Sequence, residues 1–147
     1  MNNTNEMVVE FSSVASNERF ARMVVAAFLT STNPTLEEVS DVKTAVSEAV
    51  TNSIIHGYES KDGMIRIKAV VKGRSIYLEI TDEGVGIEDV KRAMEPLYTT
   101  KPQEDRSGMG FAFMEAFMDK VVVESTYGKG TVVKMWKEIG VIKPQFE

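Results

Sequence analysis

Three polar residues, Glu48, Asn52 and His56, recur every four positions in one segment of the 147-residue chain. At about 100° per residue, a helix places all three on one side, beside Ala45 and Ala49 at the border of its apolar face. Partial desolvation raises the basicity of a carboxylate there, and an amide oxygen one turn on is a ligand for Mg²⁺. The pattern therefore suits a general base or a metal site at Glu48 and Asn52, with a plain polar helix edge as the alternative.

A second candidate segment is Asp82-Glu83-Gly84-Val85-Gly86, which directly follows a predicted strand. Glycines permit positive φ angles and let a flat ligand approach the backbone closely. Asp82 is then in position to accept a hydrogen bond from an adenine amino group. A tight strand-to-helix turn explains Gly84 and Gly86 equally well, so both interpretations stay open.

The segment Arg106-Ser107-Gly108-Met109-Gly110 is predicted to lie where a loop enters a helix. Free backbone N–H groups and the positive end of the helix dipole are available there to phosphate oxygens. Arg106 adds a cationic contact for the terminal phosphate. A flexible hinge is the competing explanation of the two glycines.

Two further segments carry hydroxyl groups. Thr99-Thr100-Lys101 lies in a polar stretch, about 95–108, that has no buried-face pattern and is predicted to be a mobile lid. Its hydroxyls and ammonium group suit a nucleotide, although a solvated loop is the alternative. Gly128-Lys129-Gly130-Thr131 is first of all a hairpin turn, and Thr131 is expected to border a base pocket.

Hydrophobic periodicity predicts the elements that position these residues. Thr35 and Glu38 form a capping-box pattern, which opens a helix that is apolar on one side as far as Ile54 and ends at Gly57. The other expected elements are a strand over 6–13, a helix over 16–29 capped by Ser16 or Asn17, an antiparallel hairpin over 64–71 and 75–81, a short helix near 87–94, a helix over 109–118, and strands over 120–126 and 131–137.

Composition limits the class of protein. A chain of 147 residues, 43% hydrophobic, is long enough for one core and too short for two ordinary domains, so we expect a single domain over 1–147. The absence of cysteine excludes a disulfide scaffold and a thiolate metal site. No apolar run approaches the roughly 20 residues that span a bilayer, and the N-terminus does not resemble a secretory signal, so a cytoplasmic location is expected. A net charge of -5 argues against binding to nucleic acid phosphates.

The order of these segments resembles the GHKL superfamily of ATPases and kinases, whose N, G1 and G2 boxes match Glu48–Gly57, Asp82–Gly86 and Gly108–Gly110. The resemblance spans nearly the whole chain. Within the superfamily the wording is most similar to the sporulation anti-sigma kinases, in Val46–Asn52, Ile54–Tyr58, Thr99–Pro102 and Arg106–Phe111.

This resemblance implies an α+β fold of the Bergerat ATP-binding type, a two-layer α/β sandwich in which helices cover one face of a mixed, mostly antiparallel sheet. It implies a protein serine kinase that uses Mg·ATP to phosphorylate a serine of a small anti-anti-sigma partner of the STAS type. It also implies a homodimer that sequesters a sporulation sigma factor.

The same resemblance implies roles for individual residues. Glu48 corresponds to the general base for the serine hydroxyl, Asn52 to the Mg²⁺ ligand and Asp82 to the adenine-reading carboxylate. The residues expected to contact the nucleotide are Gly84, Gly86, Lys101, Ser107, Gly108, Met109, Gly110 and Thr131, with Thr99, Thr100 and Arg106 at the phosphates.

Other residues have an ordinary structural explanation. Glu18 and Arg22, at i and i+4 on the first helix, correspond to a surface shared by both protein partners, but an exposed ion pair is the alternative. We assign His56 no catalytic role, because a lone histidine near a helix C-terminus commonly caps the helix or complements its dipole. The methionines and phenylalanines of 109–118 are expected to be core residues.

Three alternative functions stay open. A general-stress anti-sigma kinase shares the same boxes and differs in its partners. A non-catalytic module would use nucleotide only to stabilise a sigma-binding conformation. A structural α/β domain with glycine turns would bind no nucleotide. Tyr98 departs from the phenylalanine of many superfamily members, and the absence of a preceding phosphoacceptor domain favours a kinase that acts on a separate protein.

Overall fold

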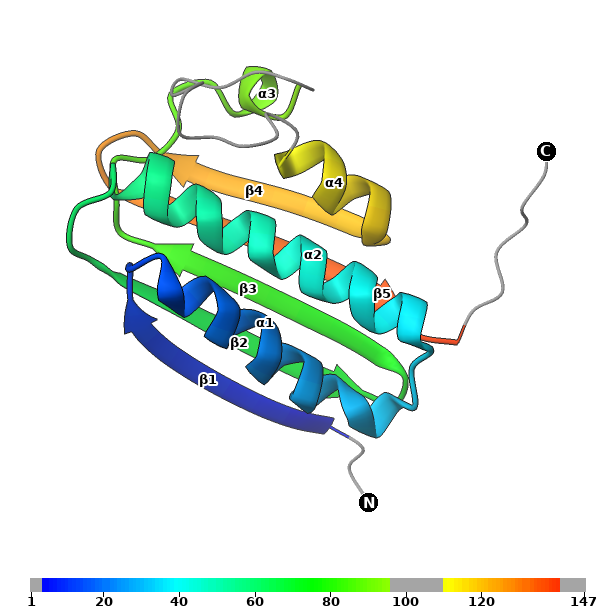
Figure 1. Cartoon of the computed structure of the whole chain (residues 1–147). Helices are drawn as coiled ribbons and strands as arrows, with labels where there is room; N and C mark the ends of the chain where they lie inside the picture. Colours follow the sequence, from blue (N-terminus) through cyan, green and yellow to red (C-terminus); the bar gives the residue numbers. More distant parts are fainter. Residues whose placement is uncertain (1–3, 96–109, 141–147) are drawn as a thin grey trace.

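A five-stranded sheet and the helices on one of its faces make up the described part of the chain, residues 4–95 and 110–140 of the computed structural model (Figure 1). The strand order is β1-β2-β3-β5-β4, and every neighbouring pair is antiparallel. The α+β sandwich is confirmed, but the sheet is antiparallel throughout rather than mixed. The strands are β1 (Thr4–Ser12), β2 (Met64–Lys72), β3 (Ser75–Asp82), β4 (Lys120–Thr126) and β5 (Gly130–Glu138).

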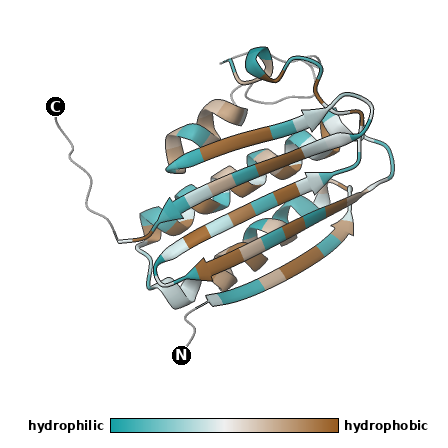
Figure 2. Cartoon of the chain, turned by 180° about the vertical axis from the view of Figure 1, so that it is seen from behind, coloured by the Kyte–Doolittle hydropathy of each residue, from teal (hydrophilic) through white to brown (hydrophobic). Residues whose placement is uncertain are grey.

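Helices cover one face of this sheet, and the opposite face is uncovered in the described part (Figures 1 and 2). α1 packs against α2, and α2 also packs against α4. A π-helical turn, Ser53–Gly57, continues α2 toward the loop that leads to β2. The helices are α1 (Ser16–Leu29), α2 (Leu36–Asn52), α3 (Val90–Ala93) and α4 (Gly110–Phe117).

The capping box predicted for α2 is confirmed. The Thr35 side chain accepts a hydrogen bond from the Glu38 backbone N–H (3.1 Å), and the Thr35 N–H donates to Glu38 Oε1 (2.9 Å). The other carboxylate oxygen of Glu38 accepts from Gly140 N (2.7 Å), which ties the start of α2 to the end of β5. These hydrogen bonds anchor the helix at its N-terminus. The helix is oriented about its axis so that Val46 and Val50 are buried, and Glu48 and Asn52 are half-buried at one side.

The predicted cap of α1 is wrong. Neither Ser16 nor Asn17 caps the helix, because the residue before it, Ala15, already has helical backbone angles and makes no side-chain cap. The chain reverses sharply after β1, and Asn17 Nδ2 instead donates to the carbonyl of Ser12 at the strand end (2.9 Å). The side chain is thus used to hold the β1–α1 corner.

Alternation along β3 decides where Asp82 points. Ile76, Leu78 and Ile80 are buried against the helices, and Asp82, two residues on, continues the same side of the strand. The register pairs Asp82 with Ile65 of β2 and with Thr131 of β5. A carboxylate therefore stands at the end of an otherwise apolar row, beneath the C-terminal turn of α2.

The uncovered face of the sheet is turned toward the viewer in Figure 2, and charged and aromatic side chains pair across its strands. Lys134 and Glu124 form an ion pair (3.0 Å), and the rings of Tyr77 and Trp136 lie 4.9 Å apart. In residues 4–95 and 110–140, no helix combines the length and apolar character needed to cross a bilayer.

Candidate functional site

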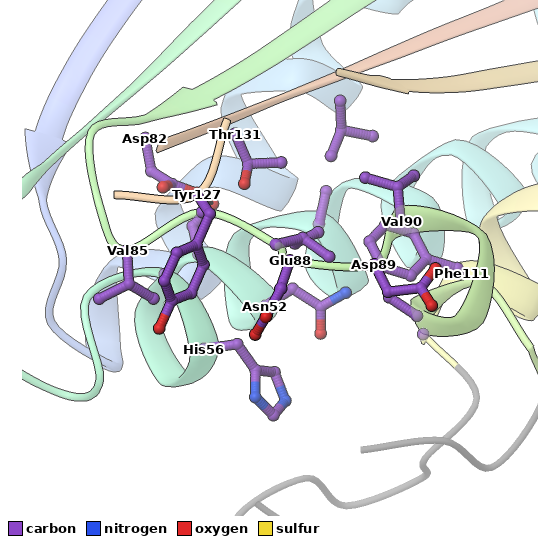
Figure 3. A pocket seen from close by; sticks show the side chains of 18 of the residues that line it. Asn52, His56, Asp82, Val85, Glu88, Asp89, Val90, Phe111, Tyr127 and Thr131 are labelled. Atoms are coloured by element: carbon purple, nitrogen blue, oxygen red, sulfur yellow. Dashed lines mark hydrogen bonds between the residues drawn. The ribbon is translucent and has the colours of Figure 1, made fainter. Parts of the chain in front are cut away.

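A pocket of about 890 Å³ lies between the π-helical turn, the segment after β3, the β4–β5 turn and the start of α4 (Figure 3). Its volume lies within the range of small-molecule and cofactor sites. Elements far apart in sequence meet here. The predicted site residues that line it are Asn52, Asp82, Gly86, Gly110 and Thr131.

Asp82 lies at the inner wall of the pocket and is only 5% exposed. Its Oδ1 accepts from Gly84 N (2.9 Å) and its Oδ2 from Ser53 Oγ (2.8 Å), and the Thr131 backbone also hydrogen-bonds to it. Burial raises the pKa of Asp82 above its ordinary value of 3.8, and these three hydrogen bonds oppose the rise. The carboxylate is held in one orientation, which suits recognition of an N–H donor on a ligand.

Gly57, at the end of the π-helical turn, packs directly on this carboxylate. A Cβ at Gly57 would lie 2.9 Å from Cγ and both carboxylate oxygens of Asp82. The carbonyl of Gly57 accepts from Val85 N (2.8 Å), so the turn also holds the loop that follows Asp82. The N box and the G1 box are thus in backbone contact.

The loop after Asp82 is fastened on both sides. A Cβ at Gly84 would lie 2.0 Å from the Gly57 carbonyl oxygen, while Gly86 has a φ of 77°. On the opposite side, Ile87 N donates to Ser125 Oγ (2.7 Å). Gly84 and Gly86 are therefore required by backbone packing, which supports the tight-turn interpretation, and Gly84 is not a lining residue.

Glu48 and Asn52 approach the pocket from α2. A Cβ at Gly110, the first residue of α4, would lie 3.0 Å from Asn52 Nδ2 and 3.3 Å from Glu48 Oε2. The start of α4 therefore lies against both candidate residues. Asn52 lines the pocket, whereas Glu48 lies one turn nearer the N-terminus of α2 and does not line it.

The donor set fits a divalent cation that is shared with a phosphate. Asn52 offers an amide oxygen beside the Glu48 carboxylate, and Mg²⁺ is commonly bound by one or two protein oxygens together with phosphate oxygens. Within the described ranges, no group of three or more His, Cys, Asp or Glu side chains could hold a metal ion by itself.

Glu18 connects α1 to the segment that carries Glu48. Its Oε2 accepts from Arg22 Nε (2.8 Å), and its Oε1 accepts from Ser47 Oγ (2.7 Å), the residue before Glu48. The side chains of Arg22 and Glu18 are 35% and 22% exposed. The predicted ion pair is present, and it is half-buried rather than fully exposed.

Several lining residues were not among the predicted site residues. His56, which we had assigned no catalytic role, faces the pocket beside Asn52 (Figure 3). Phe111, predicted as core, packs against the core and lines the pocket as well, while Met114 and Met118 are buried as predicted. The remaining lining residues that sequence reasoning missed include Ser53, Val85, Ile87, Glu88, Asp89 and Tyr127. The sequence signal for these residues is that each lies in a candidate segment or within three residues of one: Ser53 follows Asn52, for example, and Tyr127 precedes Gly128.

Part of the predicted site lies outside the described residues. This applies to the lid over about 95–108, of which only Glu95 is described, and to the phosphate-binding start of the next helix. These contacts stay predictions. The residues concerned are Thr99, Thr100, Lys101, Arg106, Ser107, Gly108 and Met109.

The chain is similar to known proteins over most of its length. Residues 11–137 match the histidine kinase-like ATPase domain. The chain is 59% identical over 140 residues to the anti-sigma F factor of Thermoanaerobacter sp. (strain X514), covering 95% of this chain and 98% of that one. It is 54% identical over 139 residues to the anti-sigma F factor of Clostridium acetobutylicum, with 95% and 97% covered.

A solved structure has the same fold. It contains the RsbU and RsbW domains of Rv1364c from Mycobacterium tuberculosis and superposes with a TM-score of 0.67 at 17% identity. The match covers 92% of this chain and 32% of that one, so this chain spans about a third of that protein. At this identity the likeness concerns the fold.

Proposed function

The chain belongs to the anti-sigma F factors of the histidine kinase-like ATPase family, and from this we propose that it is an ATP-dependent protein serine kinase that also sequesters sigma F. It takes a phosphoryl group from Mg·ATP and gives it to a serine of an anti-anti-sigma partner of the STAS type. The observation that carries the proposal is the convergence of Asp82, Asn52 and Gly110 on one pocket in a chain of this family.

Asp82 and Thr131 are proposed to bind the adenine base of the nucleotide. Asp82 is buried and its oxygens are oriented by Ser53 and Gly84, so its ionised form accepts a hydrogen bond from the exocyclic amine of adenine at little further cost in ordering. Thr131, 8% exposed, borders the same wall. Gly86 and Gly110 line the pocket further out and are proposed to contact the nucleotide.

Phosphoryl transfer requires positioning, charge neutralisation and a proton acceptor. The serine oxygen of the partner attacks the γ-phosphorus, the bond to the β–γ bridging oxygen breaks, and ADP leaves. Glu48 takes the proton of the serine hydroxyl. Asn52 is proposed to hold the Mg²⁺ ion, which neutralises phosphate charge when it is bound.

Protein partners are proposed to dock on α1. Two exposed apolar side chains of α1, Phe20 (48%) and Met23 (63%), offer apolar area for docking, while Glu18 and Arg22 lie on the side of the helix that faces α2. We also propose that the chain forms a homodimer. The general-stress alternative is disfavoured, because the relatives of high identity are anti-sigma F factors.

The test is transfer of labelled γ-phosphate from Mg·ATP to a purified anti-anti-sigma partner. Glu48→Gln keeps the size of the side chain and removes the base, so we expect the rate to fall about 10²- to 10⁴-fold while ATP still binds. Glu37→Gln is the matched control, since Glu37 is exposed in the first turn of α2 and does not line the pocket. Equal rates for native and Glu48→Gln proteins would contradict the assigned base. Tight ATP binding without any transfer by the native chain would favour the non-catalytic module.

A further inference from the structure

Two exposed apolar side chains stand at the mouth of the pocket, on the same side as Asp82. Val85 is 36% exposed and Tyr127 is 66% exposed, and both line the pocket. Figure 3 shows the Tyr127 ring extending from the β4–β5 turn beside Val85, across the opening from Asn52. Most of Tyr127 is therefore open to contact with a ligand in this pocket.

The position of Tyr127 is fixed relative to Asp82. Gly128 N donates to the carbonyl of Val85 (2.5 Å), which joins the β4–β5 turn to the loop after Asp82. A Cβ at Gly86 would lie 3.0 Å from the Tyr127 Cα, and a Cβ at Gly130 would lie 2.2 Å from the Asp82 carbonyl oxygen. The two segments are in backbone contact on both sides of Tyr127.

A base that meets Asp82 through its edge still needs its faces covered. Asp82 supplies a polar contact in the plane of the base. The two flat aromatic faces of the base are left exposed to water by that contact. An aromatic side chain next to a base contributes about 1–3 kcal/mol, and the contact area grows with the size of the base. Tyr127 is the exposed aromatic side chain that lines this pocket in the described residues.

We propose that Tyr127 packs against a face of the bound base and makes the site prefer purine over pyrimidine nucleotides. The inference rests on the proposed function, since it needs a nucleotide in this pocket. It concerns the base alone. The phenol hydroxyl is not required, because the contact is made by the ring.

The experiment measures ATP, ADP and UTP affinity by calorimetry for the native chain, Tyr127→Phe and Tyr127→Ala. We expect Tyr127→Ala to weaken ATP and ADP about tenfold, the order of one lost base–aromatic contact. Tyr127→Phe should stay within about twofold of native, and the ratio of ATP to UTP affinity should fall only in Tyr127→Ala. Leu36→Ala, which removes an exposed apolar side chain far from the pocket, is the control and should match native.

A structural role for Tyr127 is separated by a ligand without a base. Inorganic tripolyphosphate, measured by competition, should bind Tyr127→Ala as it binds the native chain. Equal weakening of tripolyphosphate and ATP would mean that the substitution disturbs the turn, and would overturn the inference.

A fluorescence readout gives an independent check. Trp136 is the chain's only tryptophan and lies on the uncovered face of the sheet with Tyr77, so Tyr127→Trp in a Trp136→Phe background reports on the pocket mouth alone. ATP should change that emission and tripolyphosphate should not. If ATP binds the native chain but Tyr127→Ala has native affinity, the inference fails and the proposed function stands. If the native chain binds no ATP, both fail.

Discussion

At the base end of the pocket (Ser53, Gly57, Asp82 and Gly84), buried hydrogen bonds and backbone contacts hold the carboxylate, whereas at the transfer end (Glu48, Asn52 and Gly110) half-buried side chains lie against the start of a helix. The base end is built from the same contacts that join α2 to β3. The transfer end consists of side chains that extend from helices held in place by other contacts. Changes at the base end should therefore damage fold and binding together, and changes at the transfer end should damage chemistry alone.

The largest effect is expected from Gly84→Ala. The new methyl group would lie 2.0 Å from the Gly57 carbonyl oxygen, so the loop after Asp82 must move and the Val85 N–H to Gly57 hydrogen bond is lost. We expect the free energy of unfolding to fall by about 2–3 kcal/mol and ATP binding to be abolished. Urea unfolding and calorimetry measure the two. Gly73→Asn is the control, because a Cβ there meets nothing and asparagine tolerates its positive φ. Native stability in Gly84→Ala would break the comparison.

Gly110→Ala makes the matching change at the transfer end. Its Cβ would lie 3.0–3.3 Å from side-chain atoms of Asn52 and Glu48, which can rotate away. Stability should be unchanged or rise by about 0.5–1 kcal/mol, because alanine is the better helix former. Displacement of Glu48, the general base, and of Asn52, the metal ligand, should slow phosphoryl transfer about 10- to 100-fold. Thermal unfolding and the transfer rate are the measurements, and a large loss of stability would show that the two ends are not separable.

A pH effect on stability is expected at the base end. Burial raises the folded pKa of Asp82, so between about pH 4 and that pKa the folded state holds more protons than the unfolded state, and stability falls as the pH rises. Asp82→Asn should flatten this part of the stability curve. ATP affinity should change in the opposite direction, rising with pH as Asp82 ionises to accept the adenine amine. Unfolding by urea at a series of pH values is the measurement, and parallel curves for the two proteins would contradict it.

The smallest effect is expected behind the transfer end. Ser47→Ala removes the hydrogen bond from Ser47 Oγ to Glu18 and leaves the Glu18–Arg22 pair in place. We expect a loss of about 0.5–1 kcal/mol in stability and a transfer rate within about twofold of native. A rate that falls as far as in Gly110→Ala would mean that Glu18 positions Glu48 through Ser47, and would extend the transfer end to α1.

Much of the fold was predictable because local signals agreed with it. The Thr35 and Glu38 capping box and the alternation along β3 each have one consistent reading, and the elements formed close to the expected bounds. The cap of α1 was wrong because Asn17 bonds to the end of β1, a contact between elements that a local pattern does not contain.

The site was predictable only as a set of types. The sequence placed Asp82 after a strand and Asn52 on a helix, but Ser53 was not predicted, because its contact with Asp82 joins residues 29 apart. The π-helical turn that brings Gly57 onto that carboxylate also has no periodic signature. Tyr127 was missed since a tyrosine in a hairpin turn is ordinary until its neighbours are known.

The position of Asp82 as the last residue of β3, on the same side as Ile76, Leu78 and Ile80, limits how the gene can change in length. Deleting one codon inside β3 would place Glu83 or its neighbour at the pocket wall in place of Asp82. The side chains of β3 on one side of the deletion would then point to the other face of the sheet. Codons added at the β2–β3 turn, around Gly73, leave the pairing of β3 with β5 intact. Length variation among relatives should therefore gather at that turn and be absent from the strand.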